Sequence, residues 1–259
     1  MPDQTTSQSI AHLFTSALPA EAIKSDAETI ELMSQDIWSK GTDAALVLCP
    51  ATTEELQAIA RIAYENDIKV NPRGAGMSYT NGYTPDRTNT VVLDTAARMN
   101  KIVEINTDDM YVTVQAGVSW QSLYEALKPL GVRTPFWGPL SGITSTIGGG
   151  VSQNNAFFGA GNYGPSTESV TSVTVVLADG TCVKTGAGGT RNGAPFWRHY
   201  GPDLTGMFLG DAGRLGLKAE VTLRLIQTPA YEDWASFEFE TQDACATAAQ
   251  SVAKTGLAC

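Results

Sequence analysis

Cysteine and histidine are scarce in this chain of 259 residues, which holds only four cysteines and two histidines. The cysteines stand alone, without the paired spacing of zinc sites or redox motifs: Cys49, Cys182, Cys245 and Cys259. A chain of this length with 42% hydrophobic residues can bury a core without disulfides. We therefore expect a protein of a reducing compartment, with the cytoplasm as the default.

The histidines do not indicate a metal centre or a hydrolase. His12 lies in a polar N-terminal stretch and His199 in a polar, aromatic turn, so both are expected to be structural or superficial. A zinc or iron centre needs three or more side-chain ligands, and none stand at motif spacing. No Gly-x-Ser-x-Gly nucleophile elbow occurs either. The sequence therefore predicts no metal and no serine hydrolase.

Positive charge and long apolar runs are also lacking. The chain has 17 Lys and Arg against 27 Asp and Glu, a net charge of −10, which argues against nucleic acid or a membrane surface as the partner. No apolar run approaches the roughly 20 residues of a membrane helix, and the N-terminus lacks signal-peptide features. A small anionic ligand remains compatible, because local N–H groups and a few cations bind phosphate regardless of net charge.

Glycine is plentiful, and it gathers in two loops some sixty residues apart, 73–78 and 139–150. Residues without a Cβ let several backbone N–H groups converge on an anion. One glycine cluster alone is more often a tight turn, but two suggest a clamp for a diphosphate. A Rossmann site is not indicated, because Gly-x-Gly-x-x-Gly is missing after a first strand.

The first half of the chain predicts a strand-helix-strand unit. An apolar run at 45–49 predicts a strand, and Thr52 with Glu55 matches a capping box that opens a helix to residue 64. Strands are expected at 68–70 and 91–94. The first glycine loop directly follows a strand, where cofactor loops often sit.

The second half predicts mainly antiparallel sheet. Alternation favours strands at 111–115, 173–177 and 221–225. Asp179-Gly180 before 181–183 indicates a hairpin with a two-residue turn. Further on, a helix is expected at 120–127, a strand at 237–240 and an alanine-rich helix at 243–254.

These elements predict an α+β fold with a small mixed α/β lobe and a larger, mainly antiparallel lobe flanked by helices. We expect an N-terminal helical segment at 1–44, a first lobe at 45–105, a second lobe at 106–229, and at 230–259 the start of a further domain whose remainder is absent. The alternative for the last segment is a C-terminal helix that packs back on the second lobe.

Four segments in order resemble one known family. They are 70–78; 91–94 with 98–102; 141–150 with Asn154 and Tyr163-Gly164; and 200–216. Over about residues 45–228 the chain resembles the FAD-linked oxidases of the vanillyl-alcohol oxidase or p-cresol methylhydroxylase (PCMH) type. Within these it is similar to the D-lactate dehydrogenases and glycolate oxidase flavoprotein subunits.

The resemblance implies a two-lobed PCMH-type FAD-binding fold with FAD between the lobes and the flavin directed toward a separate substrate-binding cap. The diphosphate would lie against the glycine loops, and Arg73 would lend a positive charge. The cofactor-binding residues implied are Pro72, Arg73, Gly74, Ala75, Gly76, Met77, Ser78, Gly82, Pro139, Leu140, Ser141, Gly142, Thr144, Ser145, Gly148, Gly149, Asn154, Tyr163, Gly213, Leu215, Gly216 and Leu217.

Three departures from the family pattern affect the cofactor site. Met77 stands where members with a covalent histidine link carry that histidine, and Thr144 stands near the position of the cysteine in doubly linked members. Neither side chain forms the bond that imidazole or thiolate makes, so we expect dissociable FAD. Ala212 replaces an acidic residue frequent in the branch, which puts one contact of the closing loop in doubt.

The resemblance implies an FAD-dependent oxidoreductase that oxidises an alcohol or 2-hydroxyacid by hydride transfer to flavin N5. No catalytic residue is assigned, since the base and the substrate-binding arginines would lie in the absent cap. The partners expected are a small-molecule substrate, an electron acceptor of unknown identity and a candidate partner subunit. Two alternatives stay open: a non-catalytic FAD-binding module that needs a partner chain, and a related FAD domain of the molybdenum hydroxylase or UDP-sugar reductase type that meets NAD(P)H.

Overall fold

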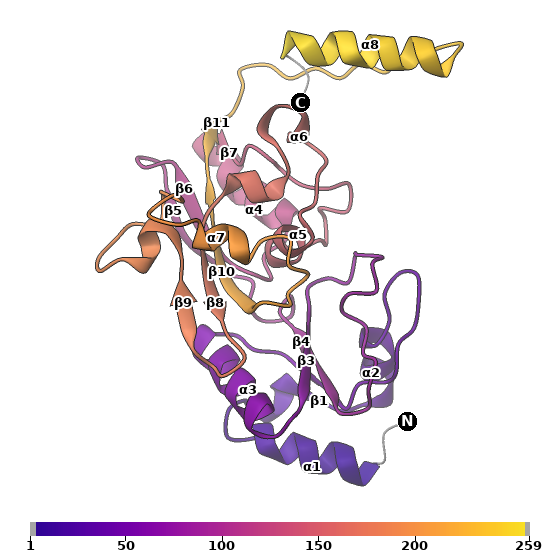
Figure 1. Cartoon of the computed structure of the whole chain (residues 1–259), viewed down its shortest axis with the longest axis vertical. Coiled ribbons are helices and arrows are strands. Elements are labelled where there is room, and N and C mark those ends of the chain that lie inside the picture. Colours follow the sequence, from indigo (N-terminus) through magenta and orange to yellow (C-terminus); the bar gives the residue numbers. More distant parts are fainter. Residues whose placement is uncertain (1–3, 257–259) are drawn as a thin grey trace.

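The computed structural model describes residues 4–256 and forms two lobes, each built around its own sheet and buried core. Figure 1 shows the N-terminal lobe with helices α1, α2 and α3 at one end of the molecule and the C-terminal helix α8 at the other. This agrees with the predicted α+β class and with a mixed first lobe and an antiparallel second lobe.

The first lobe has a four-stranded sheet of order β1-β2-β4-β3. Its strands and helices are β1 (Ile23–Lys24), β2 (Leu46–Leu48), β3 (Lys69–Arg73), β4 (Thr90–Asp94), α1 (Gln4–Phe14), α2 (Ala27–Met33) and α3 (Thr53–Glu65). Strands β2, β4 and β3 are parallel, and β1 is antiparallel to β2. Because β3 and β4 run the same way, their carboxyl ends, Arg73 and Asp94, meet at one edge of the sheet.

Helix α3 begins at the predicted cap, with a small difference. Thr52 Oγ1 accepts a hydrogen bond from Glu55 N (3.2 Å), as a capping box requires. The Glu55 carboxylate, however, accepts from Ala51 N (2.7 Å), one residue before the expected donor. Leu56, Ile59 and the small residues in register with them are buried, as their helical spacing predicts.

The second lobe has a five-stranded antiparallel sheet of order β5-β6-β10-β8-β9. Its strands are β5 (Ile102–Asn106), β6 (Tyr111–Gln115), β8 (Val170–Val176), β9 (Cys182–Lys184) and β10 (Leu217–Arg224), with a small ribbon of β7 (Val132–Arg133) and β11 (Ile226–Gln227). Its helices are α4 (Trp120–Leu127), α5 (Ile147–Gln153), α6 (Ala160–Tyr163) and α7 (Leu204–Met207). Short 3₁₀ turns η1–η4 occur at Ala20–Ala22, Lys128–Leu130, Ser166–Ser169 and Gly186–Gly189. The sheet of the second lobe thus begins at Ile102, a few residues before residue 106, where the sequence predicts that this lobe begins.

The predicted hairpin is present, but its loop is one residue longer than expected. Val176 pairs with Cys182, and Leu177 N donates to Thr181 O (2.8 Å), which leaves three residues, 178–180, in the loop. Gly180 has φ of 85°, the left-handed conformation that a three-residue hairpin loop places at its last position.

The N-terminal segment is part of the first lobe. Phe14, Leu18 and Ala22 are buried in the same core cluster as β2 and β4, and β1 adds a strand to the sheet. The two lobes also share packing, because Leu217 and Ala219 of the second sheet join this first-lobe core.

The C-terminal segment differs from one prediction and agrees with another. Residues 237–240 form no strand, so that prediction is wrong; with no neighbouring strand to pair with, the alternating apolar residues stay irregular and exposed. Helix α8 (Gln242–Thr255) forms as predicted, has no buried residue among those described, and stands off from the lobes in Figure 1. Residues 257–259, which carry the end of the expected further domain, lie outside the described residues.

Across residues 4–256 no helix has the length and apolar character needed to cross a membrane.

We predict that Phe14→Ala destabilises the protein by about 3–5 kcal/mol, because a fully buried aromatic ring leaves a cavity in the first-lobe core. Urea unfolding measures the change, and His12→Ala on the exposed face of the same helix is the matched control. Equal stability of the two variants would mean that the N-terminal segment does not belong to the first lobe.

Candidate functional site

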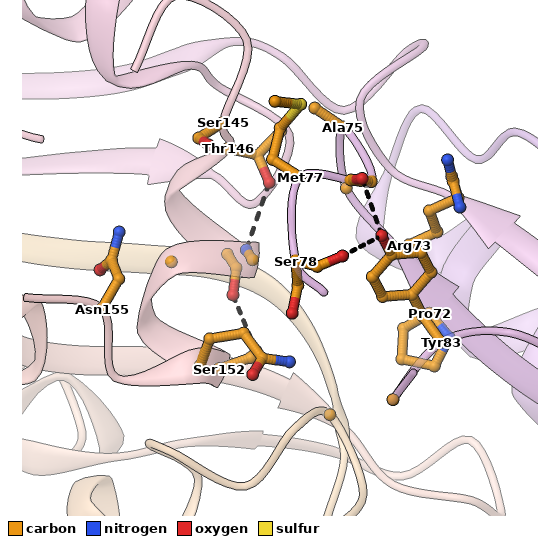
Figure 2. Close-up of a pocket in the computed structure, with 18 of the residues that line it drawn as sticks. Pro72, Arg73, Ala75, Met77, Ser78, Tyr83, Ser145, Thr146, Ser152 and Asn155 are labelled. Atoms are coloured by element: carbon orange, nitrogen blue, oxygen red, sulfur yellow. Dashed lines mark hydrogen bonds between the residues drawn. The ribbon is translucent and has the colours of Figure 1, made fainter. Parts of the chain in front are cut away.

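A cavity of about 810 Å³ lies between the lobes, where three loops meet. The first follows β3, the second leads into α5, and a closing loop at 210–216 leads into β10. This volume is within the range of small-molecule and cofactor sites. Figure 2 shows residues of the first loop on one side and Ser145, Thr146, Ser152 and Asn155 on the other.

Tyr83 fixes the shape of the first loop. Its hydroxyl lies 2.7 Å from both Gly76 O and Ser78 O, so these two carbonyls share its single O–H donor. Burial raises the pKa of Tyr83 to about 12, so the phenol stays protonated and remains a donor. Gly76 has φ of 70°, and a Cβ there would overlap the Arg73 guanidinium, so a side chain at this position would strain the turn and displace Arg73.

Arg73 supports the loop from behind. Its guanidinium donates to Gln35 O (2.5 Å) and lies 4.8 Å from the centre of the Tyr83 ring. Burial lowers its pKa from the ordinary arginine value, although Tyr83 and Asp94 oppose that shift. In Figure 2 the Arg73 side chain lies on the opposite side of the loop from Thr146. Its contacts are therefore structural, and a contribution of its charge to the cofactor stays a prediction.

The second loop approaches the sheet closely at Gly148. Gly148 N donates to Ala116 O (2.8 Å), and a Cβ on Gly148 would lie 2.6 Å from the Ala116 Cβ. Thr146 caps α5 by accepting from Gly149 N (3.2 Å). The Ser141 and Ser145 hydroxyls lie 2.7 Å apart, which brings the turn that precedes the helix together.

The closing loop is tied to both other loops. Gly210 N and Ala212 N donate to Val151 O and Ser152 O, each at 2.9 Å. Gly213 has φ of 73°, and a Cβ there would lie 2.7 Å from Pro72 Cγ. Ala212 also takes a left-handed conformation, with φ of 51°, which is unusual for a residue with a Cβ.

Most of the predicted site residues line this cavity. They are Pro72, Arg73, Gly74, Ala75, Gly76, Met77, Ser78, Gly82, Pro139, Leu140, Ser141, Ser145, Gly148, Gly149, Gly213, Gly216 and Leu217. That they contact a cofactor stays a prediction.

Five predicted residues do not line it: Gly142, Thr144, Asn154, Tyr163 and Leu215. Gly142 N donates to Pro139 O within the turn, and Thr144 faces a smaller neighbouring hollow. Tyr163 ends helix α6, and Leu215 is largely exposed outside the cavity.

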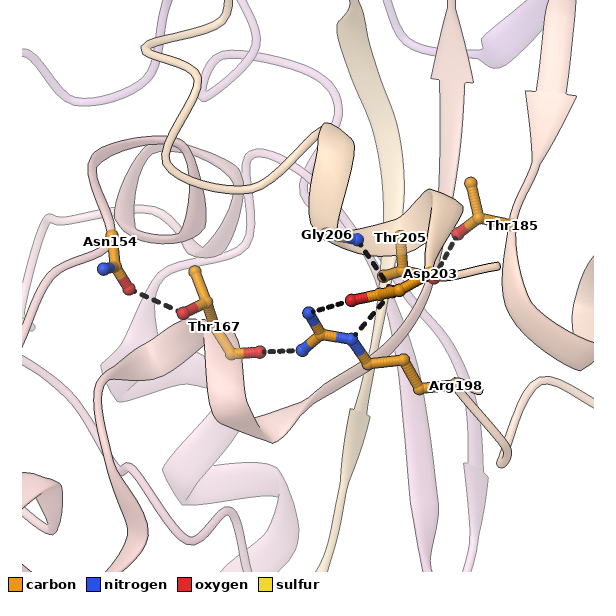
Figure 3. A network of polar contacts seen from close by, with 7 residues as sticks. All are labelled: Asn154, Thr167, Thr185, Arg198, Asp203, Thr205 and Gly206. Atoms are coloured by element: carbon orange, nitrogen blue, oxygen red, sulfur yellow. Dashed lines mark hydrogen bonds and ion pairs between the residues drawn. The ribbon is translucent and has the colours of Figure 1, made fainter. Parts of the chain in front are cut away.

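Asn154 belongs to a polar network behind the site (Figure 3). It ends α5 with φ of 49°, and its Oδ1 accepts from Thr167 Oγ1 (2.6 Å). Arg198 in turn donates to Thr167 O (2.9 Å) and pairs with Asp203 (2.9 Å). Asn154 therefore fixes the end of α5 and is not part of the cavity surface.

Several cavity residues were not found from the sequence. Ile37 reaches the cavity from the N-terminal segment, where the Asp36 carboxylate holds the first loop by accepting from Asn81 N (2.9 Å). Tyr83, Asn155 and Lys218 also line the cavity. None lies in one of the glycine loops, and Lys218 is one of several polar residues of β10 (Leu217–Arg224), so nothing in the local pattern distinguishes it.

Asn155 leaves an acceptor without a partner. Among the described residues its Oδ1 is buried and has no hydrogen-bond partner, and neither has the nearby Trp120 Nε1. Both atoms surround Gly150, where a Cβ would crowd them at 3.0–3.1 Å. An unpaired buried polar atom in a cavity wall is the kind of group that a bound ligand satisfies.

The cavity fits a large nucleotide better than a metal. Its described lining residues contain neither histidine nor cysteine. Across residues 4–256 no group of three or more metal-ligating side chains is present. Loops without Cβ atoms and with hydroxyl side chains instead suit phosphate oxygens.

Sequence comparison agrees with this arrangement: the family described as "FAD binding domain" matches residues 44–186. The chain belongs to this family of FAD-binding domains. The match contains β2 to β9, with both glycine-rich loops. It ends before the closing loop.

Named relatives include dehydrogenases and an oxidase subunit. The chain is 32% identical over 213 residues to D-lactate dehydrogenase [cytochrome] 1, mitochondrial, of Saccharomyces cerevisiae, covering 82% of this chain and 35% of that protein. It is 32% identical over 200 residues to glycolate oxidase subunit GlcD of Bacillus subtilis, covering 77% of this chain and 41% of that protein. The chain thus spans little more than a third of the length of such relatives.

Solved structures show the same fold. An alkyldihydroxyacetonephosphate synthase superposes with a TM-score of 0.74 at 20% identity, over 86% of this chain and 41% of that one. A p-cresol methylhydroxylase with substrate bound gives a TM-score of 0.74 at 21% identity, over 88% and 45%. The predicted PCMH-type fold is confirmed.

We predict that Gly74→Ala lowers the affinity for FAD about tenfold or more, equivalent to about 1.4 kcal/mol. A Cβ on Gly74 would overlap Thr146 Oγ1, the cap of α5, and push the two glycine loops apart. Quenching of flavin fluorescence on titration measures the affinity. Gly131→Ala is the control, since Gly131 lies outside the cavity and a Cβ there would have no atom within 4 Å. Equal affinities of the two variants would mean that the loop approach does not shape the site.

Proposed function

We propose that this chain is the FAD-binding part of a flavoenzyme that oxidises a 2-hydroxyacid or a related alcohol. The observation that carries the proposal is the cavity of about 810 Å³ between the lobes, with glycine-rich loops on both walls. The names of the relatives, which include lactate and glycolate, support a 2-hydroxyacid as the substrate class.

The residues of this chain would hold and orient the cofactor. The backbone N–H groups and hydroxyls of the two glycine loops would bind the diphosphate, where Gly74, Gly148 and Gly149 leave room for close approach. Asn155, with its free Oδ1, would accept a hydrogen bond from the bound cofactor. When bound, FAD supplies the chemistry, by accepting a hydride from the substrate carbon at N5.

We propose that FAD is held without a covalent link. Met77 lines the cavity with a thioether, and Thr144 lies outside it, so neither position offers the histidine or cysteine of linked flavoproteins. Among the residues that the structure describes, the cavity lining contains no histidine and no cysteine.

The substrate base is not assigned to a residue of this chain. We propose that it belongs to a cap region, to which residues 230–259 lead. A partner subunit is proposed on the same ground, since the glycolate oxidase relative is named as a subunit. The electron acceptor stays open. The cytoplasm stays the proposed compartment, on the basis of isolated cysteines, although relatives include mitochondrial proteins.

The first test is the absorption spectrum of the purified protein before and after acid precipitation. We expect flavin bands that move entirely to the supernatant, because no covalent bond retains them. Bands that stay with the pellet would contradict the non-covalent link. A protein that is colourless and also fails to bind added FAD would contradict the proposed function.

The second test is anaerobic mixing of the FAD-loaded protein with D-lactate, glycolate or NADPH. Bleaching by a hydroxyacid is the expected result. Binding of FAD with no reduction by any hydroxyacid would favour the second candidate, a non-catalytic FAD-binding module. The observation that favours this candidate is that the chain covers only 35% and 41% of the length of these two relatives. Rapid bleaching by NADPH alone would instead favour a reductase-type FAD domain.

A further inference from the structure

The wall of the cavity contains a buried ion pair that no motif predicts. Lys218 on β10 lines the cavity, and its Nζ lies 2.6 Å from the Asp211 carboxylate of the closing loop. The two side chains are 3% and 2% exposed. An ion pair so far from water is costly unless its remaining hydrogen-bonding capacity is used.

Asp211 uses its capacity within the protein. Besides Lys218, its carboxylate accepts from Gly213 N (2.9 Å) and Leu215 N (3.2 Å), so it holds the turn of the closing loop. The carboxylate is therefore a structural centre of this loop. It would keep that role if the bond to Lys218 were removed.

Lys218 does not use its capacity. An ammonium group has three donors, and among residues 4–256 the structure gives Lys218 Nζ one acceptor, Asp211. Burial lowers the pKa of Lys218, and the nearby Asp211 charge opposes that shift. The free donors of a buried cation are expected to be satisfied by an acceptor, which the cavity would supply once a ligand is bound.

The other cation of the cavity wall is already engaged. Among the described lining residues the cations are Arg73 and Lys218, and the Arg73 guanidinium donates to Gln35 O behind the first loop. Arg73 keeps further N–H donors, but its guanidinium lies over the Tyr83 ring behind the first loop; Lys218, with one acceptor for its three donors, is the other cation of the described lining.

We propose that Lys218 donates a hydrogen bond from its ammonium group to an acceptor atom of the bound cofactor, while Asp211 holds both Lys218 and the closing loop in place. This rests on the proposed FAD site. The acceptor is a phosphate oxygen or a ring oxygen or nitrogen, all of which offer a lone pair to a cationic donor.

The test compares Lys218→Met with the double variant D211N/K218M. Lys218→Met alone leaves the Asp211 charge buried without its partner and is expected to lower both thermal stability and FAD affinity. The double variant removes both charges; the single amide oxygen introduced in place of the carboxylate can still accept from Gly213 N or Leu215 N, and the other of these two bonds is lost. We expect it to regain most of the stability but to bind FAD about tenfold or more weakly, as loss of a charge-assisted hydrogen bond implies.

Two results would decide the matter. A double variant that binds FAD as tightly as the wild type would overturn the proposal and leave the ion pair a purely structural feature. A wild-type protein that binds no FAD would instead overturn the proposed function. If the Met variants do not fold, Lys218→Gln, which keeps a donor for Asp211 but loses the charge, carries the same comparison.

Competition with ADP locates the acceptor. If ADP affinity falls in parallel with FAD affinity, the acceptor lies in the adenosine diphosphate half of the cofactor. If ADP affinity is unchanged while FAD affinity falls, the acceptor lies in the flavin half. Loss of affinity for neither would contradict the proposal.

Discussion

Three loops approach one another at the junction of the two lobes, and each approach takes place at a glycine. Gly148 packs on the Ala116 backbone, Gly74 beneath Thr146, and Gly213 against Pro72. A Cβ at any of these glycines would push away the segment that it contacts. The contacts of Gly74 with Thr146 and of Gly213 with Pro72 bring the two lobes together beside the cavity, and the contact of Gly148 with Ala116 packs α5 against the second-lobe sheet.

The side chains behind the loops then keep that arrangement rigid. Tyr83 and Arg73 hold the first loop from the N-terminal side, with Gln35 as an acceptor from a segment that the sequence assigned to a separate region. Asn154 anchors the end of α5 through Thr167, and Asp211 forms the turn of the closing loop. Asn154 and Asp211 thus have structural roles around the site, while glycines, serines and Lys218 are among the residues that line the cavity.

The order of strands and helices was largely predictable, because alternation and helical spacing are local signals. The strand expected at 237–240 did not form, since alternation alone provides no partner strand. The glycine loops were also predictable as cavity walls. Asn154 and Tyr163 do not line the cavity, because position near a motif does not reveal which way a side chain points.

The residues that sequence reasoning missed share a cause. Ile37 comes to the cavity from the N-terminal segment, and Lys218 stands next to the predicted Leu217; no local pattern shows that either side chain reaches the cavity. The same holds for Asp211, which stands beside the departure at Ala212 and whose role appears only when its three partners are seen together. Tertiary contacts, rather than motifs, determine these contributions.

The most direct test of the account is a titration of the FAD-free protein with FAD, FMN and riboflavin, followed by flavin fluorescence. Because the glycine loops are interpreted as a diphosphate site, the account predicts one FAD bound per chain and much weaker binding of FMN and riboflavin. Equal affinity for all three flavins, or no binding of FAD, would contradict it.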